Sequence, residues 1–198
     1  MIGDIVQLRQ EFMAICRLVY QRGLVAGAAG NISMIIPGTE YVLIKRSGSC
    51  LGSVTESDCM IIDHAGHVIE GQGRPSIEIN FHLGIYAVRA DVQAVIHTHP
   101  PIVVGFTNTM GIVPMATMTA ELVLNRVPNI PYAAAGSLEL ADLVVSAFRD
   151  PEVNTISMTN HGAVSVGATL QQAFDRADIL ESTAQTALVM QQLQRTPV

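Results

Sequence analysis

The sequence predicts one layered α/β domain over residues 1–198, in which helices cover both faces of a mixed, mainly antiparallel sheet. Segments with the apolar spacing of helices are interspersed along the chain with short strand-like runs. Tight turns join several of these runs, which suits antiparallel neighbours. Hydrophobic residues make up 49% of the 198 residues, without repeats or linker-like segments, so one substantial core is expected. The expected architecture is therefore a three-layer α/β/α domain.

The first part of the chain predicts one helix followed by two pairs of strands. Apolar residues at helical spacing favour a helix over residues 4–22, and Gly23 is the expected stop. The Pro37-Gly38 pair separates the first two strand-like runs. The predicted strands are residues 32–36, 41–45, 59–63 and 68–70, with a short capped helical turn at residues 55–58.

The second part of the chain predicts three longer helices among short strands. Ser76 is expected to be the N-cap of a helix from Pro75 to about Arg89. A strand follows at residues 92–97, and Pro100-Pro101 ends it before a short helix. The remaining predicted helices are residues 137–148 and 169–194, and the remaining strands are residues 130–133, 155–159 and 163–166.

The composition limits the possible partners and location. A formal net charge of −6 argues against a nucleic-acid binder, which needs a basic surface. No apolar run is long enough to span a membrane, and the N-terminal segment lacks the apolar stretch of a signal peptide. Three cysteines without metal-site spacing are expected to be free thiols in a reducing compartment. We therefore expect a cytoplasmic protein without nucleic-acid or membrane partners.

The stretch His97-Thr98-His99 suggests a metal site. Side chains alternate along a strand, so the two histidines point to the same face. Catalytic zinc usually has three protein ligands and one open position. His161 lies at a turn between two predicted strands and is the best candidate for the third ligand. From these residues alone, the alternative interpretation is that His97 and His99 are ordinary polar residues at the end of a strand.

One carboxylate and three further histidines are also candidates for function. Glu78 lies in the expected first turn of a helix, where the positive helix end favours its anionic form. Beside a metal-bound substrate it would serve as a base next to a carbonyl. His64 and His67 flank a glycine turn and are interpreted as solvated. His82 shares a helix face with Glu78 and is interpreted as a buried histidine with satisfied hydrogen bonds.

Seven short motifs follow one another along nearly the whole chain. They are Ala29-Gly30-Asn31-Ile32-Ser33, Lys45-Arg46-Ser47-Gly48, the strand ending in Asp63, Pro75-Ser76-Ile77-Glu78, His97-Thr98-His99-Pro100, Pro131-Tyr132 with Gly136-Ser137, and Asn160-His161-Gly162. This ordered set resembles the class II aldolase/adducin family. The resemblance implies an α/β/α domain with a largely antiparallel sheet. It also implies a homotetramer with active sites at subunit interfaces.

The resemblance further implies roles for individual residues. It places Zn²⁺, or another divalent metal such as Mn²⁺ or Co²⁺, on His97, His99 and His161. Glu78 matches the acid/base carboxylate, which can also ligate the metal when substrate is absent, and glutamate there points to the aldolase branch. The implied site for the phosphate of a small phosphorylated sugar consists of Gly30, Asn31, Ser47, Gly48 and Ser76. Hydroxyl, amide and backbone N–H groups suit this task on an acidic protein.

Two departures from the family pattern affect the expected reaction. Ile77 stands where the family has a second phosphate-binding serine, so one donor is lost. No tyrosine proton donor is present near Thr117 or Met118, or in the last five residues. The main expectation is a zinc-dependent aldolase that cleaves a phosphorylated ketose such as L-fuculose 1-phosphate to dihydroxyacetone phosphate and an aldehyde. The alternatives are a sugar-acid phosphate decarboxylase, a methylthioribulose-phosphate dehydratase with the same metal site, and a non-enzymatic adducin-like module.

Overall fold

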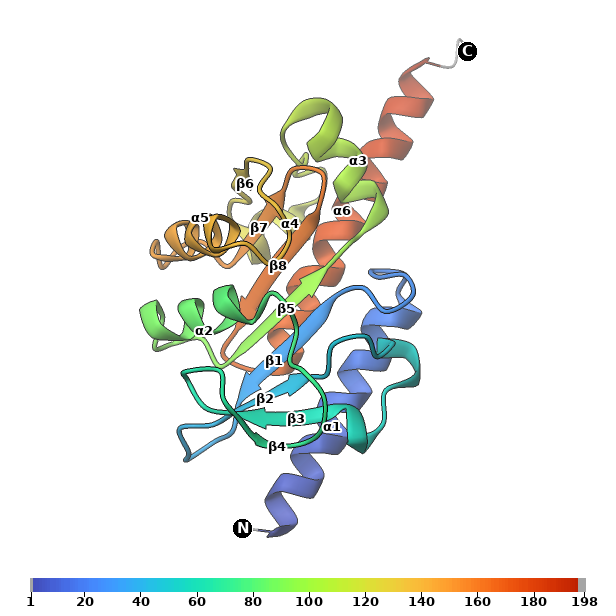
Figure 1. The fold of residues 1–198 in the computed structure, drawn as a ribbon. Helices are drawn as coiled ribbons and strands as arrows, with labels where there is room; N and C mark the ends of the chain where they lie inside the picture. The colour runs from blue at the N-terminus through green and yellow to red at the C-terminus, as the bar shows by residue number, and fades with distance from the viewer. Residues whose placement is uncertain (1, 196–198) are drawn as a thin grey trace.

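The computed structural model describes residues 2–195 and the side chains of residues 5–194, so the two ends of the predicted domain, including residues 196–198, lie outside it. Within the described chain, the strands form one sheet in the order β4-β3-β2-β1-β5-β8-β7-β6 (Figure 1). All neighbours are antiparallel except the parallel pair β6 and β7, which confirms the predicted mixed, mainly antiparallel sheet. The strands are β1 Asn31–Ile35, β2 Val42–Lys45, β3 Cys59–Ile62, β4 Val68–Glu70, β5 Ala94–Thr98, β6 Asn129–Ile130, β7 Thr155–Met158 and β8 Gly162–Gly167.

Helices cover both faces of the sheet, which confirms the three-layer α/β/α prediction. Helices α1 and α6 pack on one face, and α2 and α5 pack on the other (Figure 1). Helices α3 and α4 pack against α6. No helix in the described residues is both long and apolar enough to cross a membrane. The helices are α1 Ile2–Gln21, α2 Ile79–Val88, α3 Pro101–Met110, α4 Met118–Leu124, α5 Leu138–Phe148 and α6 Leu170–Arg195, with short 3-10 turns at Leu51–Ser53 and Glu56–Asp58.

The face of the sheet under α1 has a continuous apolar core. Phe12, Cys16 and Val19 of α1 are fully buried and belong to the same cluster as Ile32 and Ile96 of the sheet. Their separation by three and four residues places them on one side of the helix, as the apolar spacing predicts. Cys16 is therefore a core residue, and all three cysteines are free thiols, as expected.

The opposite face carries a second core between the sheet and the helices α2 and α5. Ile85 of α2 and Val144 of α5 are fully buried there, together with Val95 and Val164 of the central strands. Side chains alternate along a strand, so His97 projects from β5 on the same side as Val95. The edge of its ring meets Phe81 of α2, with 5.7 Å between the ring centroids. This core therefore supports the first residue of the predicted metal site.

The start of α2 differs from the prediction. Ser76 is not its N-cap, and the helix begins at Ile79 rather than at Pro75. The residues before it form a turn, in which Glu78 has φ −99° and ψ 13° and occupies the N-cap position. The Ser76 hydroxyl accepts a hydrogen bond from the backbone N–H of Glu78 at 3.3 Å. This turn, rather than a helical surface, directs Glu78 toward the sheet.

Two other elements differ from the prediction. Strand β6 covers Asn129–Ile130 instead of residues 130–133, because Pro131 has no N–H to continue a strand ladder. The sequence does not predict α4, in which Met118 and Leu122 are 73% and 75% exposed. Apolar residues on its exposed side obscure the helical pattern. The remaining predicted strands agree with the structure within two residues at each end.

Candidate active site

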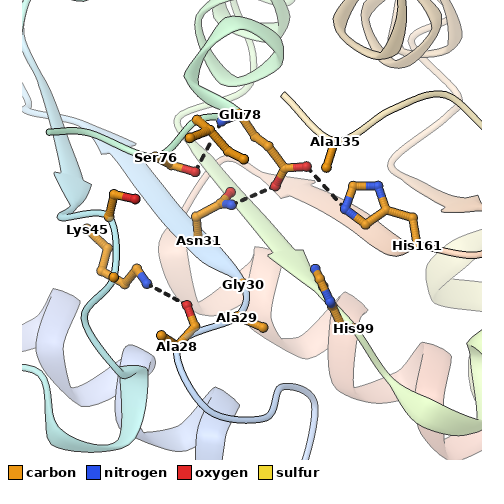
Figure 2. A pocket seen from close by; sticks show the side chains of 13 residues that line it. Ala28, Ala29, Gly30, Asn31, Lys45, Ser76, Glu78, His99, Ala135 and His161 are labelled. Carbon is orange, nitrogen blue, oxygen red and sulfur yellow. Dashed lines mark hydrogen bonds and ion pairs between the residues drawn. The ribbon is translucent and has the colours of Figure 1, made fainter. Parts of the chain in front are cut away.

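Three histidine side chains meet at one end of the central strands. His97 lies in β5, His99 follows it directly, and His161 occupies the turn between β7 and β8. The antiparallel pairing of β5 with β8 brings this turn back beside the end of β5. One ring nitrogen from each histidine lies within 4.8 Å of the others. The fold thus brings together all three predicted metal ligands, and Figure 2 shows His99 and His161 at one side of the pocket.

Two glycines allow the neighbouring backbones to come this close. A Cβ atom on Gly162 would lie 2.1 Å from the carbonyl oxygen of Thr98, a distance that no side chain tolerates. Gly30 has φ +74°, and a Cβ atom there would lie 2.5 Å from a methyl carbon of Val25. Glycine is therefore required at both positions. It allows β8, and also the segment that precedes β1, to come close to β5.

The hydrogen bonds of the histidines leave lone pairs for a metal ion. The carbonyl oxygen of Ala163 lies 2.9 Å from Nδ1 of His97 and can only accept, so Nδ1 carries the hydrogen. Nε2 of His97, which faces the other way, lies 2.8 Å from Nε2 of His99. Burial and the nearby His97 and His161 rings lower the pKa of His99 to about 3, so its ring is neutral at pH 7. Three converging imidazole nitrogens fit a divalent ion such as Zn²⁺.

The carboxylate of Glu78 lies across from the histidines. Its Oε2 atom is 3.2 Å from Nε2 of His97, and its Oε1 atom is 3.1 Å from Nε2 of His161. Burial raises the pKa of Glu78, but His97, His161 and a hydrogen bond from Asn31 together hold it well below its usual value. Glu78 is therefore an anion that faces both the ligand nitrogens and the pocket (Figure 2).

Asn31 connects this carboxylate to the sheet. It is the first residue of β1 and pairs with His97 across the ladder, so the two side chains lie on neighbouring strands. Its amide nitrogen donates to Oε2 of Glu78 at 2.9 Å, and its amide oxygen is bonded to Nε2 of His82. His82 is fully buried with both ring nitrogens bonded, as predicted. The Asn31 amide thus orients Glu78, a task that the sequence does not reveal.

The remaining predicted residues gather in a pocket of about 220 Å³ beside the histidines. Residues that precede β1, follow β2 and precede α2 form its walls (Figure 2). His97 lies behind the pocket and is fully buried. The predicted residues that line the pocket are Gly30, Asn31, Ser47, Gly48, Ser76, Glu78, His99 and His161.

Lys45 is a pocket residue to which the sequence interpretation gives no role. Its side chain is 2% exposed, and its ammonium donates to the carbonyl oxygens of Ala28 at 3.3 Å and Ser49 at 2.6 Å. Burial lowers the pKa of Lys45 from its usual value. The signal for such a role is a lysine at the end of the apolar strand β2, two residues before Ser47 of the motif. A cation at this wall of the pocket suits an anionic substrate.

Comparison with known proteins relates this arrangement to one family. A family model described as Class II Aldolase and Adducin N-terminal domain matches residues 10–188. An L-fuculose phosphate aldolase from Methanococcus maripaludis (strain C7) is 35% identical over 183 residues, which are 92% of this chain and 97% of that protein. A solved structure of an L-fuculose 1-phosphate aldolase has a TM-score of 0.85 and 25% identity, covering 97% of this chain and 89% of that one.

A relative with a different reaction is also similar over most of its length. The 3-oxo-tetronate 4-phosphate decarboxylase of Escherichia coli (strain K12) is 28% identical over 188 residues. The match covers 92% of this chain and 87% of that protein. Proteins similar to this chain thus include both aldolases and a decarboxylase.

Proposed function

Because this chain belongs to the class II aldolase and adducin family, we propose that it is a zinc-dependent aldolase that acts on a small phosphorylated ketose. The products are dihydroxyacetone phosphate and an aldehyde, and L-fuculose 1-phosphate is the first substrate to test. The observation that carries the proposal is the position of Glu78. Its carboxylate lies between the three histidines and a pocket lined by hydroxyl groups and glycines.

The substrate phosphate binds at the wall of the pocket formed by Ser47, Gly48 and Ser76. Hydroxyl and backbone N–H groups donate to phosphate oxygens without requiring a basic surface. Lys45 adds a positive charge at the same wall. Gly30 and Asn31 complete this subsite, and the Asn31 amide also holds Glu78. A phosphate fixed here places the adjacent carbons of the sugar near Glu78.

Glu78 moves the proton at the reacting carbon. In condensation Glu78 removes a proton from dihydroxyacetone phosphate. In cleavage the hydroxyl of the departing aldehyde releases its proton to solvent as the carbon–carbon bond breaks. Glu78, once it has taken up a proton, delivers it to the carbon that loses its bond partner. Its low pKa keeps the carboxylate ready to accept a proton at neutral pH. A divalent ion held by His97, His99 and His161 would supply Lewis-acid polarisation of the substrate carbonyl. The histidines and Glu78 distinguish this chain from a purely structural adducin-like module.

A second function, decarboxylation of a sugar-acid phosphate, is favoured by a specific contact. Breaking a carbon–carbon bond in an aldol requires a group that takes the proton of the leaving hydroxyl, whereas decarboxylation does not. Thr117, where the family pattern would provide a tyrosine, accepts a hydrogen bond from Ala120 and donates to Thr183. Its hydroxyl therefore caps α4. The similarity to the decarboxylase from Escherichia coli supports the same alternative.

Assays of the purified, zinc-loaded protein test both functions. We expect release of dihydroxyacetone phosphate from L-fuculose 1-phosphate or a related 1-phosphoketose, and loss of at least about 100-fold in kcat for Glu78→Gln. Release of carbon dioxide from 3-oxo-tetronate 4-phosphate, without carbonyl products from the ketoses, would identify the decarboxylase instead. Loss of water from a methylthioribulose phosphate would identify a dehydratase. Protein that binds no metal and converts none of these compounds would contradict the enzymatic proposal.

We also propose a homotetramer in the cytoplasm, as the family resemblance implies. Apolar side chains that are more than half exposed support contacts with other subunits. They include Met118, Leu122, Tyr132 and Leu138. Light scattering coupled to size exclusion tests this proposal, and a mass near that of one 21.2 kDa chain would contradict it.

A further inference from the structure

A row of buried polar groups runs from Glu78 into the layer between the sheet and α2. It consists of Asn31 and Ser33 of β1 and His82 and Tyr86 of α2, and we refer to these four residues with Glu78 as the Glu78–Tyr86 chain. The four side chains are at most 7% exposed. Residues two apart on a strand, and four apart on a helix, lie on the same face, so the two elements present matching pairs. Such burial of polar groups is unfavourable unless every group is hydrogen-bonded.

Each link of the chain is within hydrogen-bond distance. The Tyr86 hydroxyl lies 2.7 Å from Oγ of Ser33, which lies 2.7 Å from Nδ1 of His82. Nε2 of His82 then lies 2.5 Å from Oδ1 of Asn31, whose Nδ2 is 2.9 Å from Oε2 of Glu78. The chain therefore connects a tyrosine in the core to the carboxylate in the pocket without a break.

The chemistry of these groups fixes the direction of every hydrogen bond. An ionised carboxylate only accepts, so the Asn31 amide must present its NH₂ group to Glu78 and its oxygen to His82. That oxygen only accepts, so Nε2 of His82 carries the hydrogen. A neutral ring then accepts at Nδ1, which makes Ser33 the donor there. The hydroxyl of Ser33 is thereby used, so Tyr86 donates to Ser33, and all four bonds point toward Glu78.

We propose that His82 is a positioning residue for Glu78, because it fixes the orientation of the Asn31 amide. With Nε2–H directed at the amide oxygen of Asn31, the amide cannot turn over, and its N–H stays on Oε2 of Glu78. Oε1 then remains for proton exchange with the substrate. Oε1 is buried without a hydrogen-bond partner among the described residues, although Nε2 of His161 lies at ion-pair distance. This inference rests on the proposed function, since it assigns Glu78 to proton transfer.

Burial keeps the groups of the chain in the required protonation states. It lowers the pKa of His82 to about 3, with a further contribution from His97, so the ring is neutral near pH 7. Burial also raises the pKa of Tyr86 well above its usual value, so the hydroxyl keeps its hydrogen. The direction deduced from geometry is thus maintained over the whole range in which an enzyme of this kind works.

The tautomer of His82 can be measured without any activity. In metal-free, ¹⁵N-labelled protein at pH 7, long-range ¹H–¹⁵N correlation spectra distinguish a protonated ring nitrogen from an unprotonated one. We expect the neutral tautomer with hydrogen on Nε2 of His82. A ring with hydrogen on Nδ1, or a charged ring, would overturn the proposal, because either would reverse or break the chain.

Kinetics of two variants test the consequence for Glu78. His82→Leu removes the donor to Asn31, whereas the amide of His82→Gln reaches about the same point as Nε2 and keeps it. For His82→Leu we expect kcat to fall by about 10-fold to 100-fold, with KM changed by less than about 3-fold. His82→Gln should restore most of kcat.

A matched pair of serine variants separates this effect from general damage to the core. Ser33→Ala removes a donor from the chain, while Ser165→Ala removes an equally buried strand hydroxyl that accepts from Thr155 away from the pocket. We expect a lower kcat for Ser33→Ala and an unchanged kcat for Ser165→Ala. Equal effects of the two variants would overturn the proposal, and this comparison also decides the question if His82→Leu does not fold.

The two levels of inference fail in different ways. A wild-type protein that converts no phosphorylated sugar would contradict the proposed function. The spectrum of His82 would still show whether the hydrogen bonds of the Glu78–Tyr86 chain have the proposed direction. An active wild type together with a folded His82→Leu variant of unchanged kcat would contradict only the role of His82.

Discussion

Ile77 is an exposed apolar residue of the pocket in which we propose that the substrate phosphate binds. It is 65% exposed, follows Ser76 directly, and lines the same pocket as Ser47 and Gly48. An apolar side chain at this position offers no hydrogen bond to a phosphate oxygen. A serine in its place would add one donor without a need to rearrange buried atoms.

We therefore predict that Ile77→Ser lowers KM for a phosphorylated substrate by roughly 3-fold to 10-fold, while kcat changes little. This change corresponds to the net contribution of about one hydrogen bond to binding. Steady-state kinetics measure both constants. Ile69→Ser is a matched control, because Ile69 is 53% exposed on β4 and does not line the pocket. A higher KM for Ile77→Ser than for the wild type would show that Ile77 contacts an apolar part of the substrate instead.

His82 should also make stability depend on pH. Its pKa is about 3 in the folded protein because it is buried, whereas a histidine in the unfolded chain titrates near pH 6.5. Above about pH 6.5 neither state binds the proton, and the contribution of His82 to stability is fully present. Below that pH the unfolded state alone takes it up, so the free energy of unfolding falls by up to about 1.4 kcal/mol per pH unit toward pH 3.

Urea unfolding of metal-free protein at several pH values between 7 and 4 measures this slope. We expect the free energy of unfolding to fall less steeply with decreasing pH for His82→Gln than for the wild type. The difference in slope should be up to about 1.4 kcal/mol per pH unit, the value for one proton. His99, whose pKa is also lowered to about 3, contributes equally to both proteins. Parallel declines in the two proteins would contradict the assigned state of His82.

The sequence predicts these residues unequally, for physical reasons. His97 and His99 can be paired because alternation along a strand is a local property. His161 can be suggested only by its turn, because its distance to the pair depends on the register of β8 with β5. The link from Asn31 to His82 spans 51 residues of sequence and depends on how α2 packs on β1. Such contacts have no local signal.

The start of α3 depends on a distant side chain. Its N-cap is Pro100, which follows His99 directly and provides no side-chain acceptor. The carboxylate of Glu181 in α6 accepts from the backbone N–H groups of Ile102 at 3.1 Å and Val103 at 3.0 Å. Burial raises the pKa of Glu181, while these two hydrogen bonds oppose that shift. Glu181 thus provides the cap that the local sequence lacks.

We predict that Glu181→Ala lowers the free energy of unfolding by about 1–3 kcal/mol, because two partly buried N–H groups lose their acceptor. Denaturant unfolding measures this change. Asp142→Ala, at an exposed position of α5, is the control and should change the free energy of unfolding by less than about 0.5 kcal/mol. Similar losses in the two variants would argue against a capping role.

Elements with one clear apolar face are the ones that sequence predicts well. The long helices α1, α5 and α6 and the central strands lie within two residues of their predicted positions. The start of α2 is missed because Glu78 leaves helical geometry at the pocket. Helix α4 is missed because packing against α6 decides its formation, while two of its exposed residues are apolar. In both cases tertiary contacts outweigh the local pattern.

Metal binding should stabilise the molecule as a whole. The three histidines come from β5, from the residue directly after it and from the turn before β8, so an ion would hold segments about 60 residues apart in the folded state only. We predict that Zn²⁺ at 100 times its Kd raises the free energy of unfolding by about 2.7 kcal/mol, and that chelation reverses the effect. Calorimetry with and without chelator measures the change in Tm.

His161→Ala should abolish most of this zinc-dependent shift, since only two histidine ligands remain. His67→Ala is the control and should keep it, because His67 is exposed on a turn and pairs with Asp63. A wild-type Tm that does not respond to zinc, manganese or cobalt would contradict a metal site at these histidines.

The overall architecture is predictable because patterning determines it. Interspersed helices and short strands joined by tight turns are sufficient to predict the three layers and the mainly antiparallel sheet. The strand order β4-β3-β2-β1-β5-β8-β7-β6 is not, since β5 joins strands that are distant in sequence on both sides. It is this order that assembles the histidines, Asn31 and the pocket at one place.

Part of the pocket wall lies outside the strands and helices. Ser47, Ile77 and Ala135 lie in connecting segments, whereas His97 stands in the central strand of the buried sheet. Connecting segments accept replacement far more readily than paired strands do. A combinatorial library restricted to Ile77 and Ala135 should therefore yield catalysts with altered sugar preference, while every member keeps the histidines and Glu78.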